Sequence, residues 1–478
     1  MEPRAILEQR LIWHLSMKTT WSTIMLAKPQ VLQWPKGSYL YRLAGWLSDW
    51  RQGSWLLQYA EAIGACLISV VFIFAPFVST ALIGLLLIAI AAYWFLTVIS
   101  TTKKATITPV HILVFFYWCV ATVATAFSPV KSAALNGWVT LTLYLVLFAL
   151  AAQILRSPKL SNWIITSYLL TSLVVSTYGV RQEFFGVQQL ATWNDPNSAL
   201  ANDTRVYSYL GNPNLLGGYL LPAIALSIAA IFVWRGWIQK TLAVIMAMMN
   251  SACLYFTDSR GAWLAMAVLI GALLLLFYFW WQKYLPRFWQ VWLLPFVFGS
   301  LAGLFIVAFI SVEPLRIRLL SIFAGREDSS NNFRINVWEA CFKIIKDYPL
   351  IGIGPGNDAF NQIYPRYMNS RYPALSAYSV YLEHIVEMGY IGFGCFLWLI
   401  TVTVNHGIRQ LARLRQDKNK RGIYLIGAIA ATVSLGFHGF VDTVWYRPQI
   451  NTIWWLVLAI IASFYDDYSL SDRRYKAK

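Results

Sequence analysis

The sequence predicts an all-α polytopic membrane protein with about 12 transmembrane helices and one large external loop between helices 9 and 10. Composition, long uncharged stretches and the placement of basic residues predict this class. Of the 478 residues, 58% are hydrophobic, 16% are aromatic and 12% are charged. Soluble domains average about 45–50% apolar and about 25% charged residues, whereas disordered chains are polar and poor in aromatic residues. The composition therefore excludes both of these classes.

Stretches without Asp, Glu, Lys or Arg locate the expected helices, because about 20 apolar residues cross the hydrocarbon core. The first stretch, 62–102, is long enough for two helices, and Pro76 near its middle is a natural turn. Each remaining stretch provides one helix: 105–130, 132–155, 160–180, 206–234, 241–257, 261–282, 288–312, 388–408, 422–441 and 448–465.

The basic residues predict that both termini are cytoplasmic, because Lys and Arg concentrate in cytoplasmic loops. In this orientation 25 of the 38 basic residues lie inside and 13 outside, eight of the latter in the long segment 313–383. A net charge of +17 would suggest nucleic acid as the partner of a soluble protein. Here the charge is explained by the cytoplasmic loops, so we expect the lipid bilayer and no nucleic acid as a partner.

The expected helices and loops divide the chain into five parts. The first part interleaves Trp with Lys and Arg, which is typical of a segment at the cytoplasmic headgroup layer. The large external loop exceeds the roughly 15 residues beyond which loops are usually functional or disordered, and its aromatic content favours function. In chain order the parts are 1–55 (interfacial), 56–312 (helices 1–9), 313–383 (external loop), 384–465 (helices 10–12) and 466–478 (cytoplasmic tail).

Several kinds of site are not indicated. The five cysteines form no CxxC or zinc spacing, which predicts neither a disulfide framework nor a structural metal. There is no P-loop, HExxH or DxD motif, so we expect no cofactor. The GxGxG at Gly352, Gly354 and Gly356 follows a helical pattern and not a strand, so we interpret it as a flexible turn.

A helix is expected in the external loop, where Asn331 and Asn332 can cap the amphipathic run that follows them. Arg334 then falls in the first turn, where the helix dipole disfavours a cation. A bound anion would reverse that penalty, because free N–H groups and the guanidinium would bind it together. The alternative is that Glu327 and Asp328 neutralise the arginine.

Other ionisable residues lie at the outer ends of spans. Asp258 and Arg260 precede the eighth helix, as interfacial anchors or as a site where the arginine faces a phosphate. His438 and Asp442 are four residues apart near the outer end of helix eleven, on one face. They form either a functional pair or a structural one between helices.

Three motifs together resemble the O-antigen ligase and polymerase (WaaL/Wzy) superfamily: TDSRGAWLA (257–265), NFRINVWEACFKIIKDYPLIGIGPGN (332–357) and AYSVYLEHIVEMGYIGF (377–393). Two more, GNPNLLGGYLLP (211–222) and HGFVDTVWYRPQIN (438–451), resemble the cyanobacterial IctB group, whose members are named as bicarbonate transporters. The resemblance spans roughly residues 60–465 and agrees with the expected topology.

The resemblance implies a metal-independent glycosyltransferase of the plasma (inner) membrane. Such ligases move a glycan from undecaprenyl diphosphate to an acceptor at the outer face, with two arginines on the diphosphate and a histidine acting on the acceptor hydroxyl. Arg260 matches the arginine of the SRGAW motif, and Arg334 matches that of R-x3-W. Tyr378 stands where the motif H-[NSQ]-x9-G-x2-[GTY] has its histidine. A phenol is a poor base at neutral pH, and His384 on a regular helix would point elsewhere.

Three functions remain open on the sequence. The leading hypothesis is binding or transfer of a lipid-linked glycan, with Arg260 and Arg334 as phosphate ligands and Tyr378 or His384 near the acceptor. The second is IctB-type transport or accumulation of bicarbonate, although transporters place their sites at the bilayer midplane in repeated halves and no clear repeat is visible here. The third is a non-catalytic scaffold that retains the fold.

Overall fold

The computed structural model describes residues 20–21, 23–26, 46–101, 107–188 and 205–465. Most of the expected interfacial segment and the whole expected tail 466–478 lie outside the described residues. Within these ranges the chain is helical and contains no strand. The fold class predicted from composition is therefore confirmed as all-α.

Seventeen α-helices make up the described fold. They are α3 (Ser48–Gly53), α4 (Trp55–Gln58), α5 (Ala60–Phe74), α6 (Thr80–Ser100), α7 (Pro109–Ala126), α8 (Lys131–Ile154), α9 (Pro158–Phe185), α10 (Pro213–Val233), α11 (Trp237–Phe256), α12 (Arg260–Trp281), α13 (Arg287–Ser311), α14 (Glu313–Leu320), α15 (Ser329–Asp347), α16 (Asn357–Ile363), α17 (Val380–Gln416), α18 (Gly422–His438) and α19 (Pro448–Ser463).

Eight helices of the described chain are long and apolar enough to cross a membrane: α6 to α10, α12, α13 and α17. Three shorter apolar helices, α5, α18 and α19, occupy further expected stretches, and α11 occupies the stretch expected at 241–257. The break between α5 and α6 falls around Pro76, as expected. These helices support a multi-pass membrane protein.

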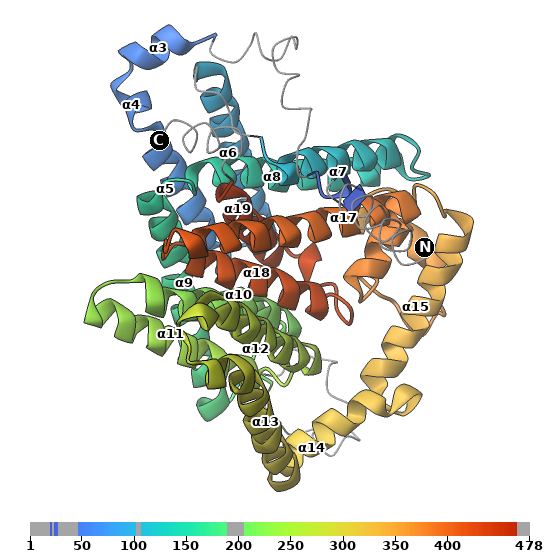
Figure 1. Ribbon diagram of the computed structural model, residues 1–478. Coiled ribbons are helices and arrows are strands. Elements are labelled where there is room, and N and C mark those ends of the chain that lie inside the picture. The colour runs from blue at the N-terminus through green and yellow to red at the C-terminus, as the bar shows by residue number, and fades with distance from the viewer. Residues whose placement is uncertain (1–19, 22, 27–45, 102–106, 189–204, 466–478) are drawn as a thin grey trace, which may run out of the picture.

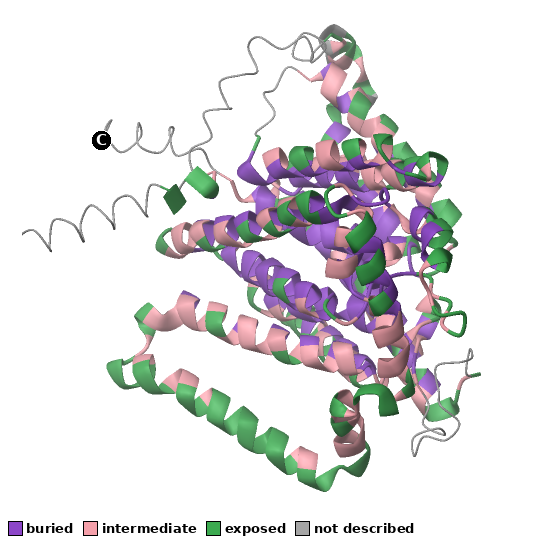
Figure 2. Ribbon diagram, turned by 90° about the vertical axis from the view of Figure 1, so that its right-hand side faces the viewer, coloured by how far each residue is buried: buried purple, intermediate pink, exposed green. Residues whose placement is uncertain are grey.

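The buried centre of the bundle is formed by α10, α18 and α19 (Figure 1). Nearly all residues of α18 and α19 are buried. Small residues permit this packing: a Cβ on Gly427 of α18 would lie 3.1 Å from the carbonyl oxygen of Ala225 in α10. At the other extreme, α13 has no buried residue and lies at the edge of the molecule (Figure 2).

The segment 313–383 is mostly helical. From α13 the chain continues through α14 to α15, which runs back along one side of the molecule and packs on α17 (Figure 1). The expected caps of α15 are wrong: the cap is Asp328, whose side chain accepts from the Asn331 N–H at 2.8 Å. The helix therefore begins earlier, and Arg334 lies in its second turn, beyond the strongest effect of the helix dipole.

A kink at Gly389 divides α17 and places the GxGxG turn against it. Gly389 has φ +64°, and a Cβ there would overlap the backbone of Leu350. Beside the kink, the Ile353 and Gly354 N–H groups donate to the carbonyls of Val386 and Glu387, each at 2.9 Å. The turn interpreted as flexible is thus held by backbone hydrogen bonds and packs on α17.

Candidate functional site

Four arginines from distant parts of the chain form an arginine cluster, comprising Arg205, Arg260, Arg318 and Arg334. The charges of the other three all act on Arg205, which precedes α10. Burial, and then repulsion by Arg318, Arg260 and Arg334, lower the pKa of Arg205 to about 10, although Asp258 partly offsets them. Like charges gathered under burial are typical of an anion site.

Arg260 connects the start of α12 to the segment 313–383. Its Nη1 donates to the carbonyl and hydroxyl oxygens of Ser321, at 3.0 and 2.9 Å, and its Nη2 donates to Asp328 Oδ1 at 2.9 Å. Burial would raise the pKa of the Asp328 carboxyl, but the hydrogen bonds from Arg260 and from the Asn331 N–H hold it below its usual value. The position of Arg260 at the first residue of α12 agrees with the sequence prediction.

Arg334 contacts the segment that follows α18. Its Nη2 lies 3.7 Å from Asp442 Oδ2, which also accepts a hydrogen bond from Asn214 Nδ2 at 2.6 Å. Its Nε is buried and has no hydrogen-bond partner in the described part of the chain, and the same holds for Nε of Arg205. Buried donors are almost always paired, so these two N–H groups distinguish the arginine cluster from an ordinary structural network.

His438 and Asp442 do not share a helix face as expected, because α18 ends at His438 and Asp442 lies in the turn that follows. Both ring nitrogens of His438 are buried and lack partners among the described residues. A Cβ on Gly261 would lie 3.5 Å from His438 Nε2. The glycine after Arg260 therefore lets α12 approach this histidine.

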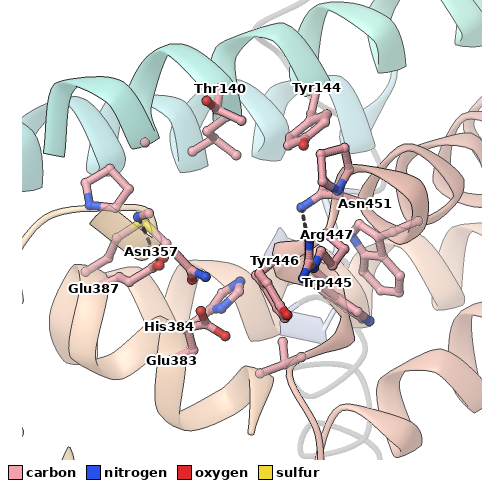
Figure 3. A pocket seen from close by; sticks show the side chains of 18 of the residues that line it. Thr140, Tyr144, Asn357, Glu383, His384, Glu387, Trp445, Tyr446, Arg447 and Asn451 are labelled. Atoms are coloured by element: carbon pink, nitrogen blue, oxygen red, sulfur yellow. Dashed lines mark hydrogen bonds between the residues drawn. The ribbon is translucent and has the colours of Figure 1, made fainter. Parts of the chain in front are cut away.

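Tyr378 and His384 lie in different environments. Tyr378 precedes α17 with φ +51°, and its ring packs edge-on against Phe333 at 5.2 Å between centroids. Burial and the charge of Asp442 raise the pKa of the Tyr378 hydroxyl, which keeps it protonated at neutral pH. His384 is inside α17, lines a cavity and packs on Phe396, with the ring centroids 4.0 Å apart (Figure 3).

We expect Tyr378→Phe to leave the activity of this site within about tenfold of the unsubstituted protein, because a neutral hydrogen bond contributes about 1 kcal/mol net. The hydroxyl makes no hydrogen bond to any residue that the structure describes, so thermal stability should not fall. The matched control is Tyr381→Phe, which removes a bond of 2.9 Å to the Gly436 carbonyl and should lower the melting temperature. A hundredfold loss of activity in Tyr378→Phe would assign the hydroxyl a catalytic role.

Of the residues singled out in the sequence, Arg260 and Arg334 lie in the arginine cluster and Asp442 contacts it. Arg205, Arg318 and Asn214, which lie beside them, were not singled out. Arg318 donates to the Asp258 carbonyl from Nε and Nη2, at 3.2 and 3.0 Å. Asn214 is the last residue of the GNPN motif, which begins α10, and Arg205 lies six residues before that motif. An arginine close to such a polar motif was the available indication. In the sequence, Arg205 and Arg318 were only counted among the 13 basic residues predicted to lie outside the cytoplasm.

The chain was compared with known proteins. A family model described as O-antigen ligase matches residues 241–397, from α11 into α17. The matched third of the chain contains Arg260, Arg334, Tyr378 and His384, whereas Asp442 lies outside it. No curated protein matches the chain. Together with the apolar helices, the family match supports an O-antigen ligase-like membrane protein.

Proposed function

We propose that the protein transfers a glycan from a lipid diphosphate carrier, of the undecaprenyl type, to an acceptor at the outer face of the plasma (inner) membrane. Both termini are then cytoplasmic, and the segment 313–383 is external. The observation that carries the proposal is the arginine cluster, in which the two arginines that the sequence singled out are joined by Arg205 and Arg318.

The charge balance of the cluster suits a diphosphate. Three nearby aspartates, Asp258, Asp328 and Asp442, partly offset the four arginines and leave a net positive site. Each guanidinium is a planar fork that can bind phosphate oxygens through two N–H groups. The unpaired Nε groups of Arg205 and Arg334 add buried donors that a phosphate oxygen would satisfy.

In the transfer step, the acceptor hydroxyl oxygen forms a bond to the anomeric carbon of the glycan. The bond from that carbon to the diphosphate oxygen breaks, and the leaving diphosphate carries away the electron pair. Preorganised guanidinium groups stabilise this developing charge. The hydroxyl proton passes to a base. The raised pKa of its hydroxyl makes Tyr378 unsuitable as that base. The carboxylate of Asp442 lies against Arg334 of the arginine cluster and is the base at hand.

The proposal predicts that undecaprenyl diphosphate stabilises the purified protein. A ligand that binds only the folded state at 100 times its Kd adds about 2.7 kcal/mol, which a thermal melt in detergent detects. Undecaprenol, with the same chain and no phosphate, is the control and should add little. Equal stabilisation by both lipids would contradict the proposal, because binding would then depend on the hydrocarbon chain alone.

The same preparation distinguishes the competing functions. Transfer of labelled glycan to an acceptor in proteoliposomes supports the ligase, whereas bicarbonate uptake without any response to lipid diphosphate supports IctB-type transport. Lipid diphosphate binding without transfer to any acceptor would leave a non-catalytic scaffold. The arginine cluster favours the first of these.

A further inference from the structure

A cavity of about 390 Å³ is lined by α6, α7, α8, α17, α19 and the turn at 355–358. Its charged groups are unevenly placed. Three carboxylates, of Asp358, Glu383 and Glu387, and one guanidinium, of Arg447, border the cavity. Figure 3 shows Glu383 and Glu387 on one side of the open space and Arg447 on the opposite side. The cavity therefore has a negative end and a positive end.

The negative end is a pair of carboxylates without a cation. Glu383 and Glu387 are four residues apart on α17, before its kink, and share a helix face. Glu383 is only 6% exposed, and the charges of Glu387 and Asp442 act on it. Its carboxylate has no hydrogen bond or ion pair among the described residues, and its oxygens are not enclosed by protein, so it opens on the cavity.

The second carboxylate of the pair is held in place. Oε1 of Glu387 accepts a hydrogen bond from the Gly356 N–H at 2.9 Å, so Glu387 cannot turn away from Glu383 without losing that bond. Like charges at this spacing repel each other, and a buried charge is costly unless it is paired. An ammonium group between the two carboxylates would remove the repulsion and pair both charges.

Aromatic rings form one wall of the cavity. Tyr117, Phe396 and Trp445 pack in series, with 6.3 and 5.8 Å between successive ring centroids. Trp454 continues the series at 3.9 Å from Trp445. Aromatic faces attract organic cations, more strongly where water is excluded. The wall therefore adds a second, independent preference for an ammonium group.

Simpler ligands match this lining less well. A metal ion needs several ligands, and no three His, Cys, Asp or Glu side chains in the described ranges are grouped so as to hold one. A simple anion would meet three carboxylates. A simple cation would leave the guanidinium of Arg447, which lies over the Tyr446 ring at 5.1 Å, without a counter-charge. A ligand with an ammonium at one end and an anion at the other matches both ends.

We propose that this cavity binds a zwitterion, with its ammonium group at Glu383 and Glu387 and its anionic group at Arg447. The chemical class is an ammonium joined to a phosphodiester by a short linker, either as a soluble molecule or as the headgroup of an ethanolamine phospholipid. The proposal does not depend on glycan transfer, because it uses none of the four arginines of the arginine cluster.

The test uses the purified full chain in a nonionic detergent, with glycerophosphoethanolamine as the probe. The control ligand is glycerophosphoglycerol, which has the same phosphodiester and no ammonium. Tryptophan fluorescence reports binding, because three tryptophans line the cavity. We expect a saturable change with the first compound and none with the second. No change with the first, or equal affinity for both, overturns the proposal.

Glu383→Gln should weaken binding of the probe about tenfold or more, the effect of losing one hydrogen bond to a charged group. The amide has the same shape and the exchange removes a like-charge contact with Glu387, so the melting temperature should not fall. The matched control is Glu339→Gln, because Glu339 pairs with Arg326 at the surface and should not affect affinity. Binding that both Glu383→Gln and Arg447→Gln leave intact refutes the site.

Two further arms test the anionic end and the source of the ligand. Arg447→Gln should weaken binding of glycerophosphoethanolamine and leave that of ethanolamine, which has no anionic group, unchanged; an equal loss for both contradicts the role of Arg447. Weaker probe binding in phosphatidylglycerol nanodiscs that also contain phosphatidylethanolamine than in nanodiscs without it assigns the cavity to the lipid headgroup. Equal binding in the two assigns it to a soluble zwitterion.

Discussion

Arg334→Lys should reduce glycan transfer about 10²- to 10³-fold, the loss that follows removal of one preorganised donor at a reacting group. The guanidinium contacts Asp442 through Nη2 and keeps its Nε free for a ligand, whereas an ammonium is a single point charge that cannot serve both. The melting temperature should change little, because only a contact of 3.7 Å is weakened. Transfer is measured with a labelled lipid-linked glycan in proteoliposomes.

Two comparisons make this result specific. Arg326→Lys is the matched control in the same segment, 313–383, where Arg326 pairs with Glu339 at the surface and should matter little. Arg260→Lys should lower both transfer and stability, since its guanidinium also connects α12 to Ser321 and Asp328. Full transfer by the Arg334 variant would show that this arginine does not hold the leaving group.

Gly137→Ala should cause a large loss of stability from a single added methyl group. Gly137 lies in α8 where the turn carrying Pro355 and Gly356 crosses it, and an added Cβ would overlap the Pro355 carbonyl. Backbone atoms cannot rotate away as a flexible side chain can, so we expect a cost of about 1–3 kcal/mol or more, as for overpacking. A thermal melt of the purified variant measures it, and the cavity that Gly137, Pro355 and Gly356 line should be distorted as well.

Gly84→Ala in α6 is the control, because an added Cβ there meets nothing within 4 Å. In an uncrowded helix, alanine is favoured over glycine by up to about 1 kcal/mol, so this variant should be neutral or more stable. If both variants melted alike, the close approach of the 355–356 turn to α8 would be refuted.

Helices could be predicted from the sequence better than the site, for a physical reason. The apolar stretches are local, and all eleven expected stretches correspond to helices even where the bounds shift. The arginine cluster depends on contacts between segments far apart in sequence, such as Arg260 with Ser321 and Asn214 with Asp442. Hydropathy carries no information about such pairs, so Arg205 and Arg318 were missed.

The GxGxG turn shows a second limit. Glycines indicate a turn, but whether the turn is loose or packed depends on its neighbours. Here the hydrogen bonds to Val386 and Glu387, and the approach to Gly137, hold it in place. The N-cap of α15 shows the same limit. Asp and Asn are both good N-cap residues, so the sequence alone could not decide between Asp328, which caps the helix, and Asn331.

The exposed helix α13 connects the thickness of the bilayer to the geometry of the arginine cluster. Its 25 residues extend about 37 Å, longer than a hydrocarbon core of about 30 Å, so it must tilt to match the membrane. With no buried residue to fix that tilt, lipid acyl length sets it at a modest cost per ångström of mismatch. The chain leaves α13 directly into α14, which carries Arg318, and reaches α15 and Arg334 through two short 3-10 helices. We therefore expect the lipid composition of the membrane to influence the positions of two of the four arginines.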